Sequence, residues 1–168
     1  MTAAMTSAPL RASAAAMNRS FPLPPPMRRA LDLAAIAAES GEVPVGAVVT
    51  RDGEIIAEAC NAMRGQVDPT AHAEIVAIRL AATRLDSSRL DGCELWVTLE
   101  PCAMCAAAIS LARIGKLNFA AEDPKGGGVL HGARVFAQPT CHHKPEVLSG
   151  IGEAEAAGQL QDFFAARR

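Results

Sequence analysis

The sequence predicts an α/β fold, a three-layer α/β/α sandwich in which helices cover both faces of a central mixed sheet of about five strands. Segments typical of strands and of helices alternate along the chain, which is the pattern of such folds. Half of the 168 residues are apolar, enough to bury the core of a single domain. No apolar run approaches the roughly 20 residues that a membrane-spanning helix needs.

The first part of the domain is predicted to be a helix followed by a hairpin. Apolar residues recur with helical spacing over 27–39, and Gly41 is placed to end that helix. Residues 43–50 and 55–60 are rich in β-branched side chains, and 51–53, Arg-Asp-Gly, is a signal for a tight turn. These segments therefore predict two strands joined as a β-hairpin.

Helical and strand-like segments continue to alternate after the hairpin. Asp68-Pro69-Thr70 is a start signal for a helix, and a proline suits the first turn of another. The predicted elements are helix 72–83, strand 94–98, a helix that begins at Pro101 and has 103–112 as its body, and strand 116–121.

The last part of the chain combines a long irregular segment with a closing helix. Glycines and prolines interrupt any regular period over residues 122–150, and a loop of this length inside a domain is usually functional. Residues 153–168 predict an amphipathic helix with Leu160, Phe163 and Phe164 on its apolar face. We expect at least one of the two phenylalanines to belong to the core.

The amino-terminal segment differs in composition from the rest. Residues 1–31 contain no acidic residue and are rich in alanine, serine and proline, with several arginines, as in a transit peptide. A tail without a fixed structure, or a start codon placed before Met17 or Met27, explains the same composition. We expect residues 1–26 to form a disordered tail and residues 27–168 to form the domain.

Charge and cysteine content narrow the classes of function. The formal net charge of −2 gives no general attraction to a polyanion, so any contact with nucleic acid has to be local and specific in shape. Five cysteines, two of them in a Cys-x-x-Cys pair, suit a reducing compartment and a metal or redox role better than a disulfide framework. We therefore expect a cytoplasmic protein.

Two short motifs predict a catalytic zinc site. They are His72-Ala73-Glu74 and Pro101-Cys102-Ala103-Met104-Cys105, and each opens a predicted helix. Imidazole and thiolate are ligands that zinc prefers, and a helix start favours the thiolate form. We expect His72, Cys102 and Cys105 to hold one Zn²⁺ per chain. Three protein ligands leave one corner of the tetrahedron for water, which distinguishes a catalytic zinc from a structural one.

Glu74 is the predicted proton carrier of this site. It follows His72 by two residues and so lies beside the metal without being a ligand. A carboxylate there can take a proton from the attacking water, transfer it to a ring nitrogen and later protonate a departing amine. Zinc lowers the pKa of water to about 7, so hydrolytic removal of an amino group becomes possible at neutral pH.

Two interpretations without catalysis remain open at this point. The histidine and the cysteines could be ordinary core residues, or the site could be a structural zinc knuckle. A knuckle needs a fourth ligand, which Cys60, Cys93 or the cluster Cys141-His142-His143 could supply. The presence of Glu74 at the open corner favours catalysis.

At these motifs the chain resembles the zinc-dependent nucleobase and cytidine deaminases, whose signature is His-x-Glu followed by Pro-Cys-x-x-Cys. Within that superfamily it is most similar to the bacterial tRNA-specific adenosine deaminases, over about residues 27–168. The segments that carry the resemblance are 42–47, Asn61, 68–74, 98–105, Asp123 with Lys125, and Asp162-Phe163-Phe164 with Arg167 and Arg168.

The resemblance implies a cytidine-deaminase-like fold and a homodimer that converts the wobble adenosine of a tRNA anticodon to inosine. The base is flipped out of the anticodon stem-loop into the zinc pocket. It also implies that Asn61 holds the purine. The other implied substrate and anticodon contacts are Val45, Ala71, Asp123, Lys125, His142, His143, Lys144, Phe163, Phe164 and Arg167.

Some features depart from this pattern. Glu122 places an acid where a basic residue is expected beside the substrate strand, and the loop 126–141 has its own glycine-rich sequence. The alternative is therefore a deaminase of free bases or nucleosides, such as guanine or cytosine and cytidine, with the same zinc and the same glutamate. A zinc-binding module that recognises RNA without catalysis is the third hypothesis.

Overall fold

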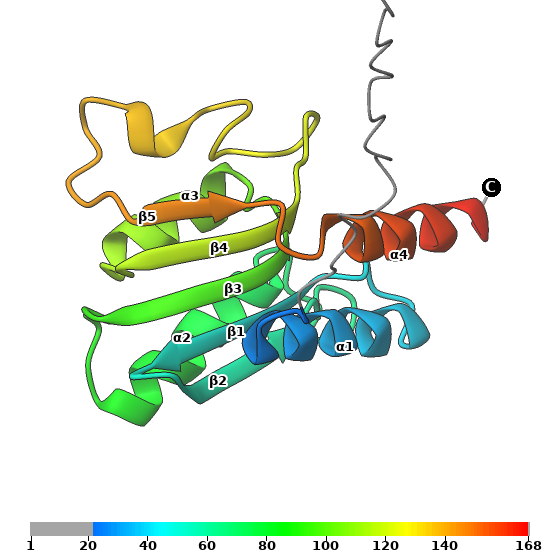
Figure 1. Cartoon of the computed structure of the whole chain (residues 1–168), viewed down its shortest axis with the longest axis horizontal. Helices are drawn as coiled ribbons and strands as arrows, with labels where there is room; N and C mark the ends of the chain where they lie inside the picture. Colours follow the sequence, from blue (N-terminus) through cyan, green and yellow to red (C-terminus); the bar gives the residue numbers. More distant parts are fainter. Residues whose placement is uncertain (1–21, 168) are drawn as a thin grey trace, which may run out of the picture.

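A computed structural model describes residues 22–167, and it shows one mixed sheet of five strands. The strand order is β2-β1-β3-β4-β5, with β1 antiparallel to β2 and β3, and with β4 parallel to β3 and β5 (Figure 1). The strands are β1 (Gly46–Arg51), β2 (Glu54–Cys60), β3 (Cys93–Leu99), β4 (Lys116–Ala121) and β5 (Glu146–Ser149).

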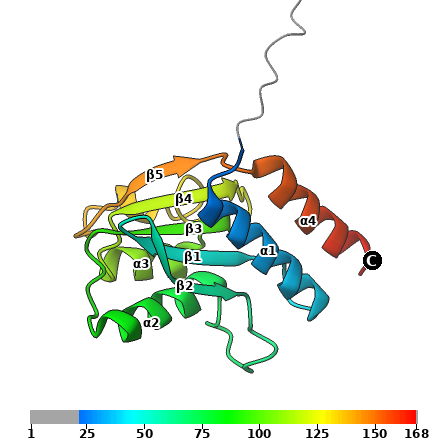
Figure 2. The ribbon, with the colours of Figure 1, turned by 60° about the horizontal axis from the view of Figure 1, so that its bottom comes forward.

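Four helices cover the two faces of the sheet. Helices α1 (Pro25–Glu39) and α4 (Glu153–Ala165) pack on one face, and α2 (Ala73–Leu85) and α3 (Ala103–Leu111) lie on the other (Figure 2). A short 3-10 helix, η1 (Val135–Ala137), packs against α3. The prediction of a three-layer α/β/α sandwich with a mixed sheet of about five strands is confirmed. No helix of the described residues is long and apolar enough to cross a membrane.

The hairpin forms through the predicted turn. Asp52 and Gly53 both have positive φ angles, 52° and 81°, and Arg51 pairs with Glu54 across them. Two central residues with positive φ define the turn whose twist matches that of the flanking strands. The first strand begins at Gly46 and not at residue 43, because the backbone N–H of Val45 donates a hydrogen bond to the Val43 carbonyl instead of to a neighbouring strand.

Helix α1 differs from its prediction at its start and agrees at its end. It begins at Pro25 and not at residue 27, because proline has no N–H to lose and is tolerated in a first turn. Leu23, before the helix, packs on the same core as α1 and α4. The helix ends at Glu39, and Gly41 follows with a φ of 80°, as predicted. Residues 1–21 of the expected tail lie outside the described residues.

The segment 122–150 is less irregular than predicted. It contains η1 and the edge strand β5, which is only four residues long and mostly exposed. So short a strand carries too few alternating residues to be recognised. Helix α3 begins at Ala103 with Cys102 as its N-cap, so Pro101 precedes the helix and does not start it.

Two apolar cores lie on opposite faces of the sheet. Leu117 and Phe119 of β4 are fully buried and point toward α2 and α3, whereas Ala120 points toward α1 and α4. On α4, Phe163 is buried, but the Phe164 side chain is 50% exposed. The expectation that at least one of the two phenylalanines is part of the core is confirmed by Phe163, although the predicted apolar face is not buried as a whole.

Candidate metal centre and substrate pocket

The three predicted metal ligands lie together where two helices begin. His72 is the N-cap residue of α2, Cys102 is the N-cap of α3, and Cys105 is in the first turn of α3. The Nδ1 atom of His72 is 3.7 Å from Cys102 Sγ and 3.5 Å from Cys105 Sγ. All three ligand atoms lie within 4.8 Å of one another.

These distances fit zinc. Zinc bonds of about 2.3 Å to sulfur and about 2.05 Å to nitrogen, at tetrahedral angles, require S···N separations of about 3.6 Å. The His72 to Cys102 and His72 to Cys105 distances of 3.7 and 3.5 Å lie on either side of that value. The donor set of one imidazole and two thiols is also the set that zinc prefers.

The two cysteines differ in protonation before a metal binds. The hydrogen bond from Cys105 lowers the pKa of Cys102 to about 4. The same hydrogen bond, together with burial, raises the pKa of Cys105. A thiolate is therefore already present at the start of α3, and binding of a cation has to displace one further thiol proton.

No fourth ligand approaches this cluster from residues 22–167. Cys60, Cys93 and Cys141 are free cysteines outside it, and no second histidine or carboxylate joins the group. The structural zinc knuckle that the sequence left open lacks its fourth ligand within the described chain. A tetrahedral metal would keep one corner for another molecule.

A cavity of about 260 Å³ opens beside the cluster. Glu74, in the first turn of α2, lines it and is only 4% exposed, and burial raises the pKa of its carboxyl group. Of the predicted substrate contacts, Val45, Asn61 and Asp123 line the cavity, whereas Ala71 is fully buried and absent from its wall. The full lining is Val43, Val45, Asn61, Met63, His72, Glu74, Leu99, Glu100, Cys102, Asp123 and Gly126.

Glu100 is a wall residue whose role the sequence did not indicate. Burial would raise the pKa of Glu100, but hydrogen bonds from the backbone N–H groups of Asp123, Leu130 and His131 and from the His131 side chain lower it to about 2. A buried charge that accepts this many hydrogen bonds fixes the loop that carries Asp123. The available signal was an acidic residue directly after a buried strand.

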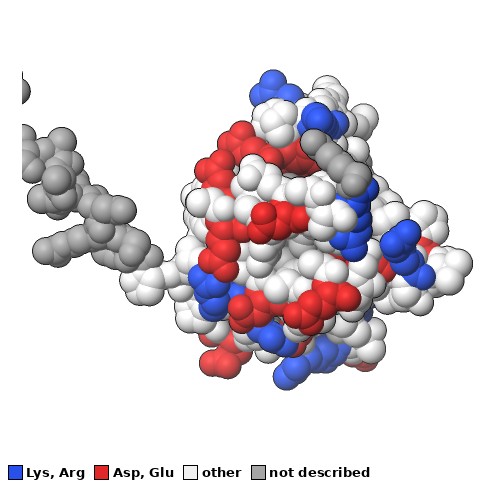
Figure 3. Space-filling model, turned by 90° about the vertical axis from the view of Figure 1, so that its right-hand side faces the viewer, with Lys and Arg blue, Asp and Glu red and all other residues white. Residues whose placement is uncertain are grey.

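Several predicted RNA contacts gather outside the cavity. Asp123, Lys125, Phe164 and Arg167 line a recess of about 540 Å³, and Asp123 also belongs to the cavity wall. The Arg167 guanidinium lies 3.5 Å from the centre of the Phe163 ring, an arrangement typical of a cation–π contact. Figure 3 shows the face at the ends of α1 and α4, which is hollowed, with acidic side chains along much of the rim and fewer basic ones at one side.

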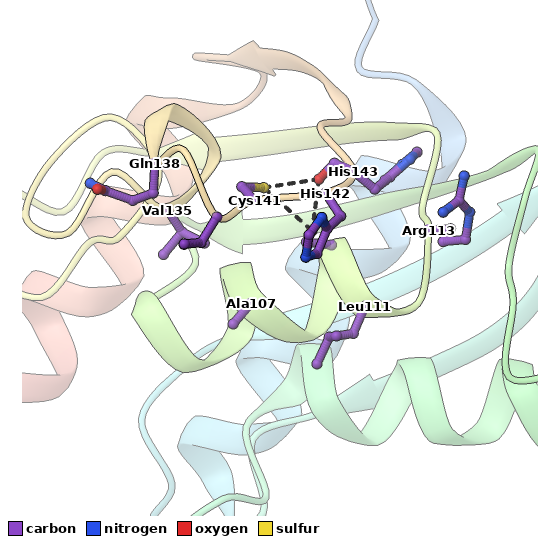
Figure 4. A pocket seen from close by; sticks show the side chains of 10 residues that line it. Ala107, Leu111, Arg113, Val135, Gln138, Cys141, His142 and His143 are labelled. Atoms are coloured by element: carbon purple, nitrogen blue, oxygen red, sulfur yellow. Dashed lines mark hydrogen bonds between the residues drawn. The ribbon is translucent and has the colours of Figure 1, made fainter.

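His142 and His143 lie elsewhere. They line a recess of about 370 Å³ over α3, which shares no lining residue with the zinc cavity (Figure 4). The Nε2 atom of His143 is hydrogen-bonded to the Ile114 carbonyl oxygen, with 2.6 Å between the two atoms. Within one chain the structure therefore does not bring these two histidines to the cavity. Glu122, the unexpected acid, faces His131, with Oε2 3.7 Å from Nε2.

Comparison with known proteins identifies the chain as similar to deaminases. The MafB19-like deaminase family matches residues 25–168. The chain is 54% identical over 142 residues to a tRNA-specific adenosine deaminase of Agrobacterium fabrum, covering 84% of this chain and 93% of the relative. It is 49% identical over 138 residues to one of Aquifex aeolicus, covering 82% and 91%.

Solved structures show the same fold. One, from a study of A-to-I editing by tRNA:A34 deaminases at the wobble position, superposes with a TM-score of 0.80 at 55% identity, covering 80% of this chain and 98% of that one. A guanine deaminase of Bacillus subtilis gives a TM-score of 0.59 at 34% identity, covering 84% and 91%. A family match over nearly the whole described chain and relatives at this identity lead to one conclusion: the chain belongs to the MafB19-like deaminase family.

Proposed function

We propose that this deaminase hydrolyses adenosine to inosine at the wobble position of a tRNA anticodon. The observation that carries the proposal is the junction of a base-sized cavity with the recess formed by Asp123, Lys125, Phe164 and Arg167. The relatives at 54% and 49% identity, both tRNA-specific adenosine deaminases, support the same substrate.

The chemistry follows from the residues of the cavity wall. His72, Cys102 and Cys105 would hold one Zn²⁺, which when bound lowers the pKa of a water molecule to about 7. Glu74 accepts a proton as water attacks the carbon that bears the amino group, and passes it to the neighbouring ring nitrogen. Glu74 then accepts the proton of the newly added hydroxyl group and transfers it to the amino group, so the C–O bond becomes a carbonyl, the C–N bond breaks and ammonia leaves. Asn61 holds the purine against this wall.

The surroundings of the cavity favour RNA over a free base. A cavity of about 260 Å³ has room for one base, so the rest of a polynucleotide has to stay outside. There, Phe164 is half exposed and offers a face for stacking, and Lys125 and Arg167 offer charge for phosphates. A free base would need no such surface.

We also propose that the protein is cytoplasmic, because its proposed tRNA substrate is in the cytoplasm. We propose further that it forms a homodimer. Leu111 on the outer side of α3 is 80% exposed beside the recess that contains His142 and His143. We place the contact with the second chain at this recess, where Ala107, Leu111 and Val135 give the surface its apolar part. Light scattering of the purified protein tests this, and a monomeric mass at micromolar concentration would contradict it.

The substrate is tested by measuring inosine. Purified protein is incubated with an anticodon stem-loop that carries adenosine at the wobble position, and separately with adenosine, guanine and cytidine. We expect inosine in the stem-loop and much slower turnover of the small compounds. Guanine is included because one of the similar solved structures is a B. subtilis guanine deaminase. Turnover of guanine without inosine in the stem-loop would overturn the proposal.

A further inference from the structure

Glu42 is a buried carboxylate behind the substrate cavity. It lies in the loop between α1 and β1 and is 5% exposed. Its Oε1 accepts the backbone N–H groups of Arg64 at 2.7 Å and Gly65 at 2.9 Å. Its Oε2 accepts the side-chain amide of Asn61, with 3.4 Å between Nδ2 and Oε2. One side chain thus joins two loops and contacts Asn61 in the cavity wall.

The contact fixes the orientation of the Asn61 amide. An amide side chain can turn its oxygen or its nitrogen toward a neighbour, but an ionised carboxylate only accepts hydrogen bonds. If Asn61 turned over, its Oδ1 would face Oε2 with no proton between them. Glu42 cannot move to relieve this, because two backbone N–H groups hold its other oxygen.

From this geometry we infer that Glu42 is a positioning residue that sets which hydrogen-bonding groups Asn61 presents to the base. Asn61 lines the cavity and Glu42 does not, so Glu42 acts on the substrate only through the asparagine. With one N–H engaged by Glu42, Asn61 offers its carbonyl oxygen and its second N–H to the purine edge. The inference rests on the proposed function for its substrate.

The local charges agree with this role. The Arg64 guanidinium donates to the Gly41 carbonyl and not to Glu42, and no ion pair of Glu42 occurs among residues 22–167. Burying a carboxylate without a cationic partner is unfavourable, and an amide would bridge the two loops at a lower desolvation cost. A carboxylate differs from an amide here in that it can only accept a hydrogen bond from Asn61, whereas an amide could either donate or accept one.

The test is a double-mutant cycle with Glu42→Gln and Asn61→Ala, assayed on the adenosine stem-loop. The glutamine can still accept from the two backbone N–H groups, but its amide nitrogen then faces Asn61 and inverts the asparagine. We expect KM to rise about tenfold with a smaller change in kcat, as for the loss of one hydrogen bond to substrate. In the Asn61→Ala background, Glu42→Gln should change KM less than twofold. Glu39→Gln, an exposed neighbour with the same loss of charge, is the control and should leave KM unchanged.

A second pair of variants gives a readout that needs no turnover. Asn61→Asp places a carboxylate against Glu42 and should lower the thermal unfolding temperature, and adding Glu42→Gln should restore it because the glutamine donates in the opposite direction. Additive effects in both cycles would overturn the inference and leave Glu42 as a loop anchor. Absence of inosine with the unchanged protein would instead refute the proposed substrate, while the unfolding data would still decide the role of Glu42.

Discussion

Two buried glutamates of the cavity wall have opposite surroundings. Burial raises the pKa of Glu74, whereas the backbone N–H groups around Glu100 outweigh its burial and lower its pKa to about 2. A carboxylate that carries many hydrogen bonds from a loop holds its charge and its position, whereas one whose charged form is disfavoured by burial can exchange a proton. The pair therefore divides the work, with Glu100 fixing the loop and Glu74 carrying protons.

Glu74→Gln tests that division at the level of one atom. The amide has the shape of the carboxylate but cannot accept the proton, so kcat on the stem-loop should fall by about 10² to 10⁴. Zinc content, measured by atomic absorption, should stay at one per chain because Glu74 is not among the ligands. If the variant kept wild-type turnover, another group would have to be the proton carrier.

Asn118 is a residue whose side chain works against stability. It is fully buried in β4, and neither its Oδ1 nor its Nδ2 has a hydrogen-bond partner in the described structure. Leucine has the same number of side-chain heavy atoms, branched at the same position, and no polar atoms, so Asn118→Leu should raise the free energy of unfolding by about 1–3 kcal/mol. Urea denaturation measures the change. Asn118→Asp, which buries a charge, should shift the midpoint in the opposite direction.

The predicted metal ligands and Glu74, which the structure brings together, form two pairs that are close in the sequence. His72 and Glu74 are two apart, Cys102 and Cys105 are three apart, and the structure places both pairs at helix starts. The hydrogen bond between Glu42 and Asn61 joins separate loops, and the partners of Glu100 lie more than 20 positions away along the chain. Such contacts depend on how the loops meet, so no local pattern indicates them.

At the scale of elements, the approach of α1 to β1 depends on Gly46. A Cβ atom there would lie 2.0 Å from the Ala30 carbonyl oxygen and 2.8 Å from the Ala34 nitrogen, both backbone atoms of α1. Gly46→Ala should therefore lower the free energy of unfolding by about 3 kcal/mol or more, since helix and strand have to separate. Gly158→Ala is the matched control, because nothing lies within 4 Å of its added Cβ in α4. That control should gain about 0.5–1 kcal/mol, and equal effects of both variants would contradict the packing argument.

The sequence predicted long periodic elements better than short ones. Strand β4 occupies 116–121 as predicted, because most of its residues are apolar and the segment lies between Gly115 and Pro124, which are clear breaks. The edge strand β5 and the start of α1 were not predicted correctly, since the first has four residues and the second begins inside a proline run. In both cases pairing or packing with distant residues decides the element, which local propensity does not report.

At the scale of the whole molecule, a net charge of −2 limits how RNA can be bound. Three basic side chains, Arg64, Lys125 and Arg167, line recesses that adjoin the cavity. With about 0.7 counterions released per phosphate contact, log KM for the stem-loop should rise by about 2 per tenfold increase in salt. Arg167→Ala should reduce that slope by about 0.7. Arg113→Ala, at the separate recess over α3, should leave the slope unchanged. A smaller slope in that variant would indicate that RNA binds at the recess over α3 instead.

Zinc removal tests how far the site holds the fold together. The metal ligands come from the starts of α2 and α3, so a bound ion joins the two helices that cover one face of the sheet. An ion that binds only the native state at 1,000 times its Kd adds about 4 kcal/mol, which corresponds to about 10 °C in unfolding temperature for a chain of this size. Chelation by EDTA should lower the unfolding temperature by that amount.

Cys105→Ser should lose both the zinc and the effect of EDTA, whereas Cys141→Ser, outside the cluster, should keep both. If Cys105→Ser retained one zinc per chain and the wild-type unfolding temperature, the cysteine would not be a ligand and the geometry of the cluster would need another explanation.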